Sequence, residues 1–148
     1  MLTTIEKVIL LQAVDVFADV PTANLAYIAA IAEEVSFAAG TTIFSEGDPA
    51  TAMFFVLDGR VSLQRDGNEI AVAEANQGFG VWALFDEERR VVTATTVTTV
   101  RLLRIESESF AEILADHAEI AQFLLKTLTR RLRSIMERLQ LEHGRRPA

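Results

Sequence analysis

The stretch that decides the fold is "IFSEGDPATAMFFVLDGRVSLQRDGNEIAVA", residues 43–73. Its short apolar runs alternate with polar positions at the period of two that β-strands show, and each run ends at a turn signal. "AMFFVL" ends at Asp58-Gly59, and "RVSLQR" ends at Asp66-Gly67. Because Asp-Gly pairs between alternating hydrophobic runs favour tight hairpins, this stretch predicts consecutive antiparallel strands.

The strand pattern continues on both sides of this stretch. Val35 and Phe37 alternate with polar neighbours before Gly40, and "RRVVTATTV" (89–97) is expected to pair with "TVRLLRI" (99–105). Eight or so short strands joined by tight turns predict a mainly β fold with flanking α-helices. The predicted architecture is an eight-stranded antiparallel jelly-roll β-barrel, or double-stranded β-helix, which protects its strand edges.

Helical periodicity precedes the strands. Thr3 and Glu6 have the spacing of a capping box, which predicts a helix over about 4–14. Pro21 suits the first turn of a second helix, because its fixed φ is already helical. The N-terminal helices are therefore expected over about 4–32.

Helical periodicity returns after the last strand. Ser107 or Ser109 is expected to cap a short helix, and a long amphipathic helix is predicted over about 118–141. With no internal repeat or linker in sight, the chain is predicted to be one domain over 1–148. Its barrel is expected over about 33–105 and its C-terminal helices over about 107–141.

Composition narrows the class of protein. The chain has 148 residues, is 50% hydrophobic and contains no cysteine, so a disulfide framework and a thiolate metal site are excluded. It has neither a secretion signal nor an apolar run of about 20 residues that could span a membrane. These features predict a cytoplasmic protein without a membrane span.

Charge is unevenly distributed along the chain. The net charge of the chain is −7. The segment from Lys126 onward contains seven Lys and Arg and two Glu, so its net charge is +5, and the preceding 125 residues carry −12. An acidic body repels nucleic acids, and a basic helix end is usually a solvated face. The chain alone is therefore not expected to bind DNA or RNA.

Two stretches carry a resemblance to a known family. "IFSEGDPATAMFFVLDGRVSL" is similar to its strand, glycine-acid turn and returning strand, and "FGVWALFDEERRVVTA" (79–94) stands where it keeps a phosphate-binding cassette. From about Phe17 to Leu132, the chain resembles the cyclic-nucleotide-binding domain found in the catabolite activator protein and the regulatory subunit of protein kinase A. The resemblance implies a regulatory module that senses cAMP, cGMP or a related small anion.

The resemblance also implies a site. Arg90 falls on the cassette arginine, which gives a charge-assisted hydrogen bond to the cyclic phosphate, and the backbone amides of Ala83 and Val91 are expected to help. Gly80 would let the backbone approach closely. The candidate ligand-binding residues are Gly80, Val81, Trp82, Ala83, Leu84, Arg90, Val91 and Val92.

The cassette departs from the family pattern at its most polar positions. Val81 stands where the family has the glutamate that accepts a hydrogen bond from the ribose 2′-hydroxyl. Val91 and Val92 stand at positions where the family has small residues. Loss of a hydrogen bond to a charged group weakens binding about 10- to 150-fold. The expected affinity for cyclic nucleotides is therefore weakened or lost.

Arg90 has two other interpretations. It could pair with Glu87 or Glu88 across the loop as an ordinary surface charge. Alternatively, Trp82 and the valines could line a more apolar pocket for a different small molecule.

The remaining polar residues do not predict catalysis or a metal site. The two histidines, His117 and His143, lie far apart in the sequence, and residues 86–88 are typical of a solvated acidic turn. No hydroxyl has a credible base and orienting partner. The chain is expected not to be an enzyme and to need no metal or cofactor, a cyclic nucleotide ligand excepted.

The long C-terminal helix is the expected output element. Its apolar stripe from Ile120 to Leu139 suits a homodimer through paired helices or an unidentified protein partner, but it could equally pack on the chain's own barrel. An activator-type regulator would need a DNA-binding domain after this helix, and this chain is not expected to contain one. Two functions are therefore predicted: a ligand-sensing module, or a ligand-free domain that serves association.

Overall fold

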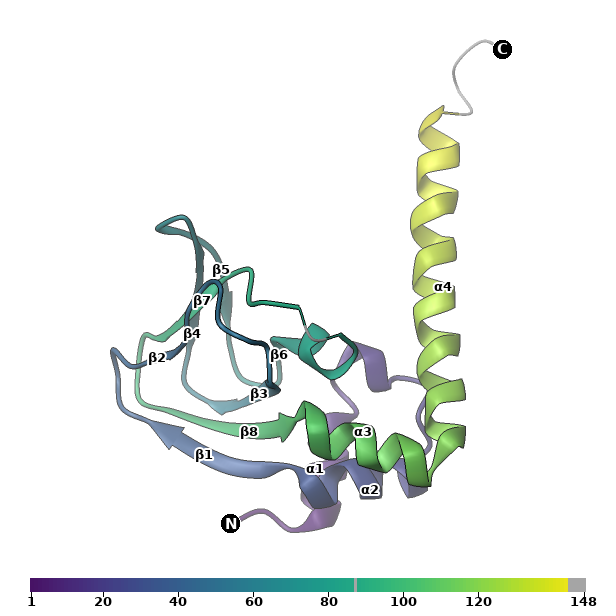
Figure 1. Cartoon of the computed structure of the whole chain (residues 1–148), viewed down its shortest axis with the longest axis horizontal. Helices are drawn as coiled ribbons and strands as arrows, with labels where there is room; N and C mark the ends of the chain where they lie inside the picture. The colour runs from purple at the N-terminus through teal and green to yellow at the C-terminus, as the bar shows by residue number, and fades with distance from the viewer. Residues whose placement is uncertain (87, 144–148) are drawn as a thin grey trace.

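The computed structural model describes residues 1–86 and 88–143 (Figure 1). Helices stand at both ends of the chain and strands between them. In chain order the elements are α1 (Thr4–Leu11), the 3₁₀ turn η1 (Asp15–Phe17), α2 (Thr22–Ile31), β1 (Glu33–Phe37), β2 (Thr42–Phe44), β3 (Ala52–Asp58), β4 (Val61–Arg65), β5 (Asn68–Ala73), β6 (Gly78–Phe79), the 3₁₀ turn η2 (Val81–Leu84), β7 (Thr93–Thr96), β8 (Val100–Glu106), α3 (Ser107–Asp116) and α4 (Ala118–His143).

The strands of the described chain form the jelly roll that the sequence predicts. They make two four-stranded antiparallel sheets, ordered β1-β8-β3-β6 and β2-β7-β4-β5, which are not closed into a continuous barrel. Strand β3 is buried on both faces: Phe54 and Val56 face the core inside the roll, while Met53 and Phe55 face a second core under the helices. The roll thus has a filled interior and one face covered by helices.

Two predicted strand pairings are wrong. The strands flanking Asp58-Gly59, β3 and β4, lie in different sheets, as do β7 and β8, whereas Asp66-Gly67 does join the paired strands β4 and β5. At Gly59 the chain crosses between sheets with φ at +95°, and a Cβ there would lie 2.4 Å from the carbonyl oxygen of Thr99. The two crossings therefore pack against each other, and this contact requires glycine.

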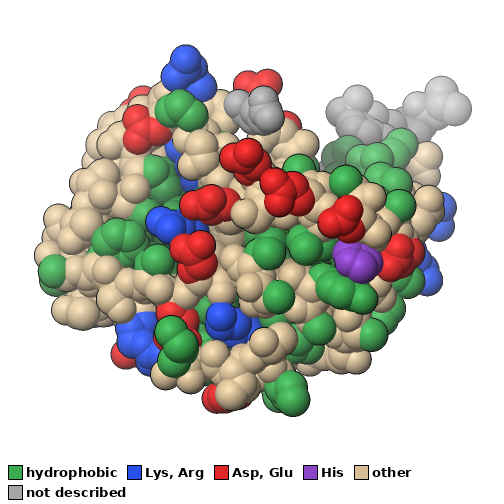
Figure 2. All heavy atoms as spheres, turned by 60° about the horizontal axis from the view of Figure 1, so that its bottom comes forward, with side chains coloured by type: hydrophobic (Ala, Val, Ile, Leu, Met, Phe, Trp, Pro, Cys, Tyr) green, Lys and Arg blue, Asp and Glu red, His purple; other side chains and the backbone are tan. Residues whose placement is uncertain are grey.

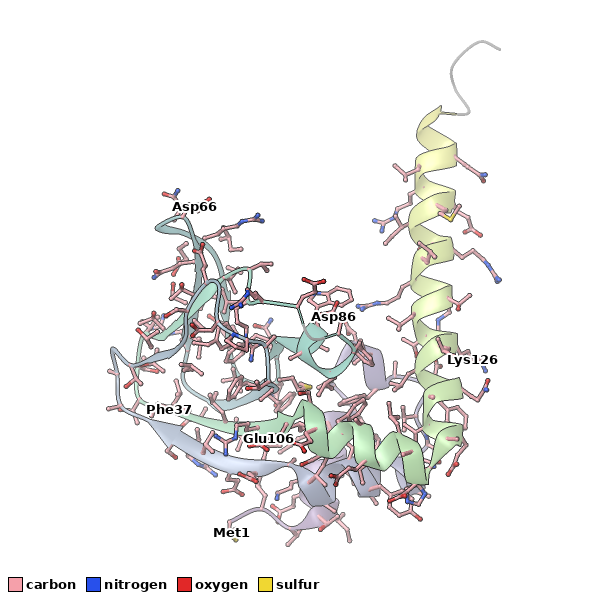
Figure 3. The ribbon with its side chains drawn as sticks, viewed as in Figure 1. Met1, Phe37, Asp66, Asp86, Glu106 and Lys126 are labelled. Atoms are coloured by element: carbon pink, nitrogen blue, oxygen red, sulfur yellow. The ribbon has the colours of Figure 1, made fainter. Side chains whose placement is uncertain are left out.

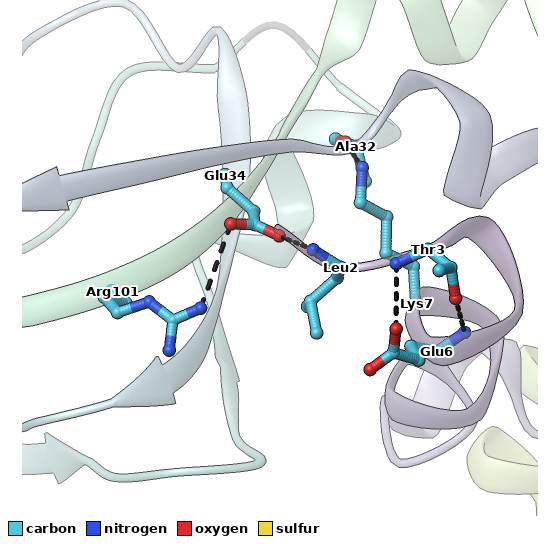
Figure 4. A network of polar contacts seen from close by, with 7 residues as sticks. All are labelled: Leu2, Thr3, Glu6, Lys7, Ala32, Glu34 and Arg101. Atoms are coloured by element: carbon cyan, nitrogen blue, oxygen red, sulfur yellow. Dashed lines mark hydrogen bonds and ion pairs between the residues drawn. The ribbon is translucent and has the colours of Figure 1, made fainter.

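The N-terminal helix is fixed by the predicted capping box. The Thr3 hydroxyl accepts from the Glu6 amide at 3.2 Å, and the Glu6 carboxylate accepts from the Thr3 amide at 3.1 Å (Figure 4). Lys7 donates to the carbonyl of Ala32 at 2.7 Å, and the Leu2 amide donates to Glu34 at the start of the roll. The helix ends at Leu11, earlier than predicted, because the chain turns into η1.

The C-terminal helices differ in how they are held. The predicted serine cap of α3 is wrong: Glu106 is the N-cap residue, its side chain makes no capping bond, and Ser107 is already helical. Ile120 and Leu124, in the first half of α4, are buried in the core under the helices. The second half stands away from the roll (Figure 1), and the predicted stripe is exposed there at Leu132, Ile135 and Leu139.

No helix in the described part of the chain is long and apolar enough to cross a membrane.

Candidate functional site

The cassette begins at a glycine whose conformation and size both matter. Gly80 has φ at +67°, a left-handed conformation, and it precedes the 3₁₀ turn η2. A Cβ at Gly80 would lie 2.6 Å from Nη1 of Arg90. A side chain at this position would therefore displace the guanidinium, so glycine is what lets Arg90 approach the turn.

Arg90 is held by the protein itself. It is only 8% exposed, and its Nη2 donates to the carbonyl oxygen of Ala52 at 2.5 Å. Its Nη1 lies 3.5 Å from the carbonyl oxygen of Gly80, and its Cζ lies 3.9 Å from the centre of the Phe44 ring. Backbone hydrogen bonds with Gly47 and Asp48 fix the loop segment on which it lies. The guanidinium is thus packed between an aromatic face and two carbonyl groups.

Burial disfavours the charged form of Arg90. Desolvation lowers the pKa of its guanidinium, and the nearby Asp48 carboxylate opposes that shift. The group still carries its charge, because an arginine does not lose its proton in proteins. Its buried Nε has no hydrogen-bond partner among the described residues. The pairing with Glu88 that one interpretation suggested is not formed, and Glu87 lies outside the described residues.

The cassette surrounds a hollow of about 400 Å³, the cassette pocket. Six of the eight candidate residues line it; the exceptions are Val81 and Leu84. Leu84 is buried in the core under the helices, and Val81 packs at the edge of that core. The pocket is lined by Phe44, Ala50, Gly80, Trp82, Ala83, Asp86, Glu88, Arg89, Arg90, Val91 and Val92.

Of the two backbone amides expected to help bind a phosphate, one is already engaged. The amide of Ala83 donates to the carbonyl of Gly80 at 3.2 Å, so it is occupied by the 3₁₀ turn. The amide of Val91 has no acceptor within the described chain and remains available. Val91 is 63% exposed, and its valine side chain forms an apolar part of the pocket wall.

A second hollow of about 660 Å³, the lateral groove, adjoins the cassette pocket, and Trp82 lines both. Sequence reasoning did not foresee the groove, because its walls come from segments far apart in the chain. It also missed Phe44 and the Ala52 carbonyl, which no motif marks. The lateral groove is lined by Ala13, Val14, Asp15, Val16, Leu63, Ala71, Val72, Ala73, Asn76, Gln77, Gly78, Val81, Trp82 and Arg131.

Acidic side chains stand near the cassette. Asp86 lies on the loop after η2, on the side of the roll toward α4 (Figure 3), and its Oδ1 accepts from the Glu88 amide at 3.1 Å. Acidic groups also spread over the face turned forward in Figure 2. Asp86 and Glu88 line the cassette pocket, and their negative charge disfavours a permanent anion there.

The other polar candidates form no metal site in the described residues. His117 is the C-cap of α3, and its ring stacks on Tyr27 with centroids 3.7 Å apart. The side chain of His143 lies outside the described set.

Comparison with known proteins agrees with the fold. Residues 34–117 match the cyclic nucleotide-binding domain family. The chain belongs to this family. It is 34% identical over 106 residues to the CRP-like cAMP-activated global transcriptional regulator of Mycobacterium tuberculosis, which covers 68% of this chain and 47% of that protein. The chain thus spans about half the length of this relative.

Two further similarities place the cyclic nucleotide-binding domain in different settings. The crystal structure of the N-terminal domain of a transcriptional regulator from Streptomyces coelicolor A3(2) superposes with a TM-score of 0.79 at 34% identity, covering 85% of this chain and 94% of that one. A lysophospholipase of Aspergillus fumigatus is 31% identical over 117 residues, 76% of this chain but 8% of the enzyme. The family's domain is regulatory, and in such an enzyme it is one part of a larger protein.

Proposed function

We propose that this chain is a regulatory module with low affinity for cAMP and cGMP. The observation that carries the proposal is the state of Arg90. Its guanidinium donates to the Ala52 carbonyl and covers the Phe44 ring, so a cyclic phosphate must compete with contacts that already exist. Val81 supplies no acceptor for a ribose hydroxyl, and Asp86 and Glu88 place negative charge beside the pocket.

The magnitudes support weak binding. A hydrogen bond to a charged group contributes about 1.5–3 kcal/mol, and a nucleotide here lacks the one to position 81. Desolvating the phosphate is unfavourable unless donors meet it, and the Nη2 of Arg90 and the amide of Ala83 already donate to carbonyl groups of the protein. Together these effects move a micromolar affinity to about the millimolar range.

Isothermal titration with cAMP and cGMP tests the proposal. The unchanged protein is expected to bind both with dissociation constants near 1 mM or weaker. Val81 lines the adjoining lateral groove next to Trp82, which lines both hollows, so Val81→Glu is expected to tighten binding about tenfold by placing an acceptor at this boundary. Val97→Glu adds the same charge at an exposed turn away from the cassette and is expected to change nothing. Micromolar binding by the unchanged protein contradicts the proposal.

Exposure of the α4 stripe favours a second function, association between copies. Leu125, Leu132 and Leu139 recur every seven residues, with Leu128 and Ile135 between them, and the three leucines are each about half exposed. This is the heptad pattern of paired helices, and although Leu128 packs against the core under the helices, Leu132, Ile135 and Leu139 are exposed.

Sedimentation tests this second function. The protein is expected to be dimeric without added nucleotide, and Leu132→Asp combined with Leu139→Asp is expected to leave monomers, because charges at paired core positions are desolvated. Arg133→Gln, on the same exposed part of α4, is the matched control. A monomeric parent protein at high micromolar concentration excludes this role.

A further inference from the structure

A third hollow, the strand-end hollow, lies between β1, β2, the loop after β2 and the adjoining ends of β3 and β8. Its volume is about 520 Å³, and it shares no residue with the lateral groove and only Phe44 and Arg90 with the cassette pocket. Phe37 and Glu106 both lie on the roll, clear of α4 (Figure 3). The lining residues that matter below are Phe37, Ile43, Asp48, Arg90, Arg104 and Glu106.

The inward face of β8 changes from apolar to charged at this hollow. Val100 and Leu102 face the core inside the roll, and the alternation of a strand puts Arg104 and Glu106 on the same face. Inward-pointing charges often protect an exposed edge strand from pairing with another chain. Strand β8, however, is paired on both sides, with β1 and with β3. Edge protection therefore does not account for these two charges.

Arg104 and Glu106 contact each other without forming a hydrogen bond. Nη2 of Arg104 donates to Glu33 at 2.9 Å, but it lies 3.7 Å from Oε1 of Glu106, which is too long for a hydrogen bond. Glu106 is the N-cap residue of α3, yet its carboxylate makes no capping bond with that helix. The guanidinium and the carboxylate thus both keep hydrogen-bonding capacity, side by side.

Buried donors without acceptors also occur at the hollow. In the described part of the chain, the buried side-chain polar atoms that lack a hydrogen-bond partner are Nε of Arg90 and Nε of Arg104, and both residues line this hollow. Arg90 is more than nine-tenths buried. Because a buried donor without an acceptor is unfavourable, such atoms mark a place where water or a ligand supplies one.

The charges that line the hollow balance one another. Arg90 and Arg104 carry two positive charges, and Asp48 and Glu106 carry two negative ones. A ligand with a net charge meets repulsion from one of these pairs, whereas a zwitterion meets an opposite charge at each end. In an α-amino acid the ammonium and the carboxylate are attached to one carbon, which matches the closeness of Glu106 to Arg104.

We propose that the strand-end hollow binds a free α-amino acid with a large apolar side chain. The carboxylate of the ligand accepts from Arg104, and its ammonium donates to Glu106. Its side chain lies against Phe37 and Ile43, which are half-buried and line the same hollow. The volume of about 520 Å³ is in the range of small-ligand sites. The inference goes beyond the proposed function, because it needs no nucleotide and no residue of η2.

Titration calorimetry with L-phenylalanine tests the inference. The unchanged protein is expected to bind it with a dissociation constant of about 0.1–1 mM, as a ligand of about 12 non-hydrogen atoms allows. The analogue 3-phenylpropionate lacks the ammonium and 2-phenylethylamine lacks the carboxylate, so each is expected to bind at least about tenfold more weakly. Equal binding of either analogue, or no binding of phenylalanine at millimolar concentration, overturns the proposal.

Substitutions assign the two charges separately. Arg104→Gln is expected to weaken phenylalanine binding about tenfold without weakening that of 2-phenylethylamine. Glu106→Gln is expected to weaken phenylalanine binding about tenfold without weakening that of 3-phenylpropionate. Arg101→Gln, on the opposite face of β8, is the matched control and is expected to change nothing. Unchanged phenylalanine binding in Arg104→Gln or in Glu106→Gln contradicts the inference, and the comparison of the three ligands tests it without any substitution.

Discussion

Phe110→Ala is expected to lower the free energy of unfolding by about 3–5 kcal/mol, the usual range for truncating a buried aromatic side chain. Phe110 is fully buried on α3. Its ring lies 6.3 Å from that of Phe17 in η1 and 6.0 Å from that of Phe85, edge-on, after the cassette turn. The substitution removes the side chain that joins the cassette to both sets of helices, and urea denaturation measures the loss.

Ile9→Ala is the control for Phe110→Ala. Ile9 is more than half exposed on α1, so its truncation is expected to change stability by less than about 0.5 kcal/mol. A loss below about 1.5 kcal/mol for Phe110→Ala means that the site collapses around the missing ring, and the packing described for the core under the helices is then wrong.

Arg90→Ala is expected to destabilise the ligand-free protein by about 2–3 kcal/mol. The change leaves the buried Ala52 carbonyl without its charged donor and uncovers the face of the Phe44 ring. A residue kept solely for a ligand has no such effect when the ligand is absent. Thermal and urea unfolding without nucleotide measure the difference.

The neighbouring arginine provides the matched control. Arg89 is exposed and donates to the Gly47 carbonyl at 2.8 Å, so Arg89→Ala is expected to change stability by less than about 0.5 kcal/mol. If Arg90→Ala and Arg89→Ala are equally stable, the guanidinium is not held by the carbonyls. The argument for low nucleotide affinity then loses its main support.

Much of the fold follows from local patterns. The alternation in 43–73 gave the strands, the Thr3–Glu6 spacing gave the cap of α1, and Asp66-Gly67 gave the β4–β5 hairpin. The cassette residues were found through a family resemblance, and six of the eight surround one pocket. These features depend on neighbours within a few residues, where propensity and turn chemistry act directly.

The pairing of strands and the contents of the site depend on contacts between distant segments. An Asp-Gly turn is compatible with a hairpin or with a crossing between sheets, and at Gly59 the close approach of Thr99 goes with the crossing. Likewise, the sequence places an arginine in the cassette, but only the folded chain brings the Ala52 carbonyl and the Phe44 ring to it. Local chemistry thus determined the elements and the residue types, whereas tertiary packing decided their partners, because burial and hydrogen bonding are satisfied by the whole chain.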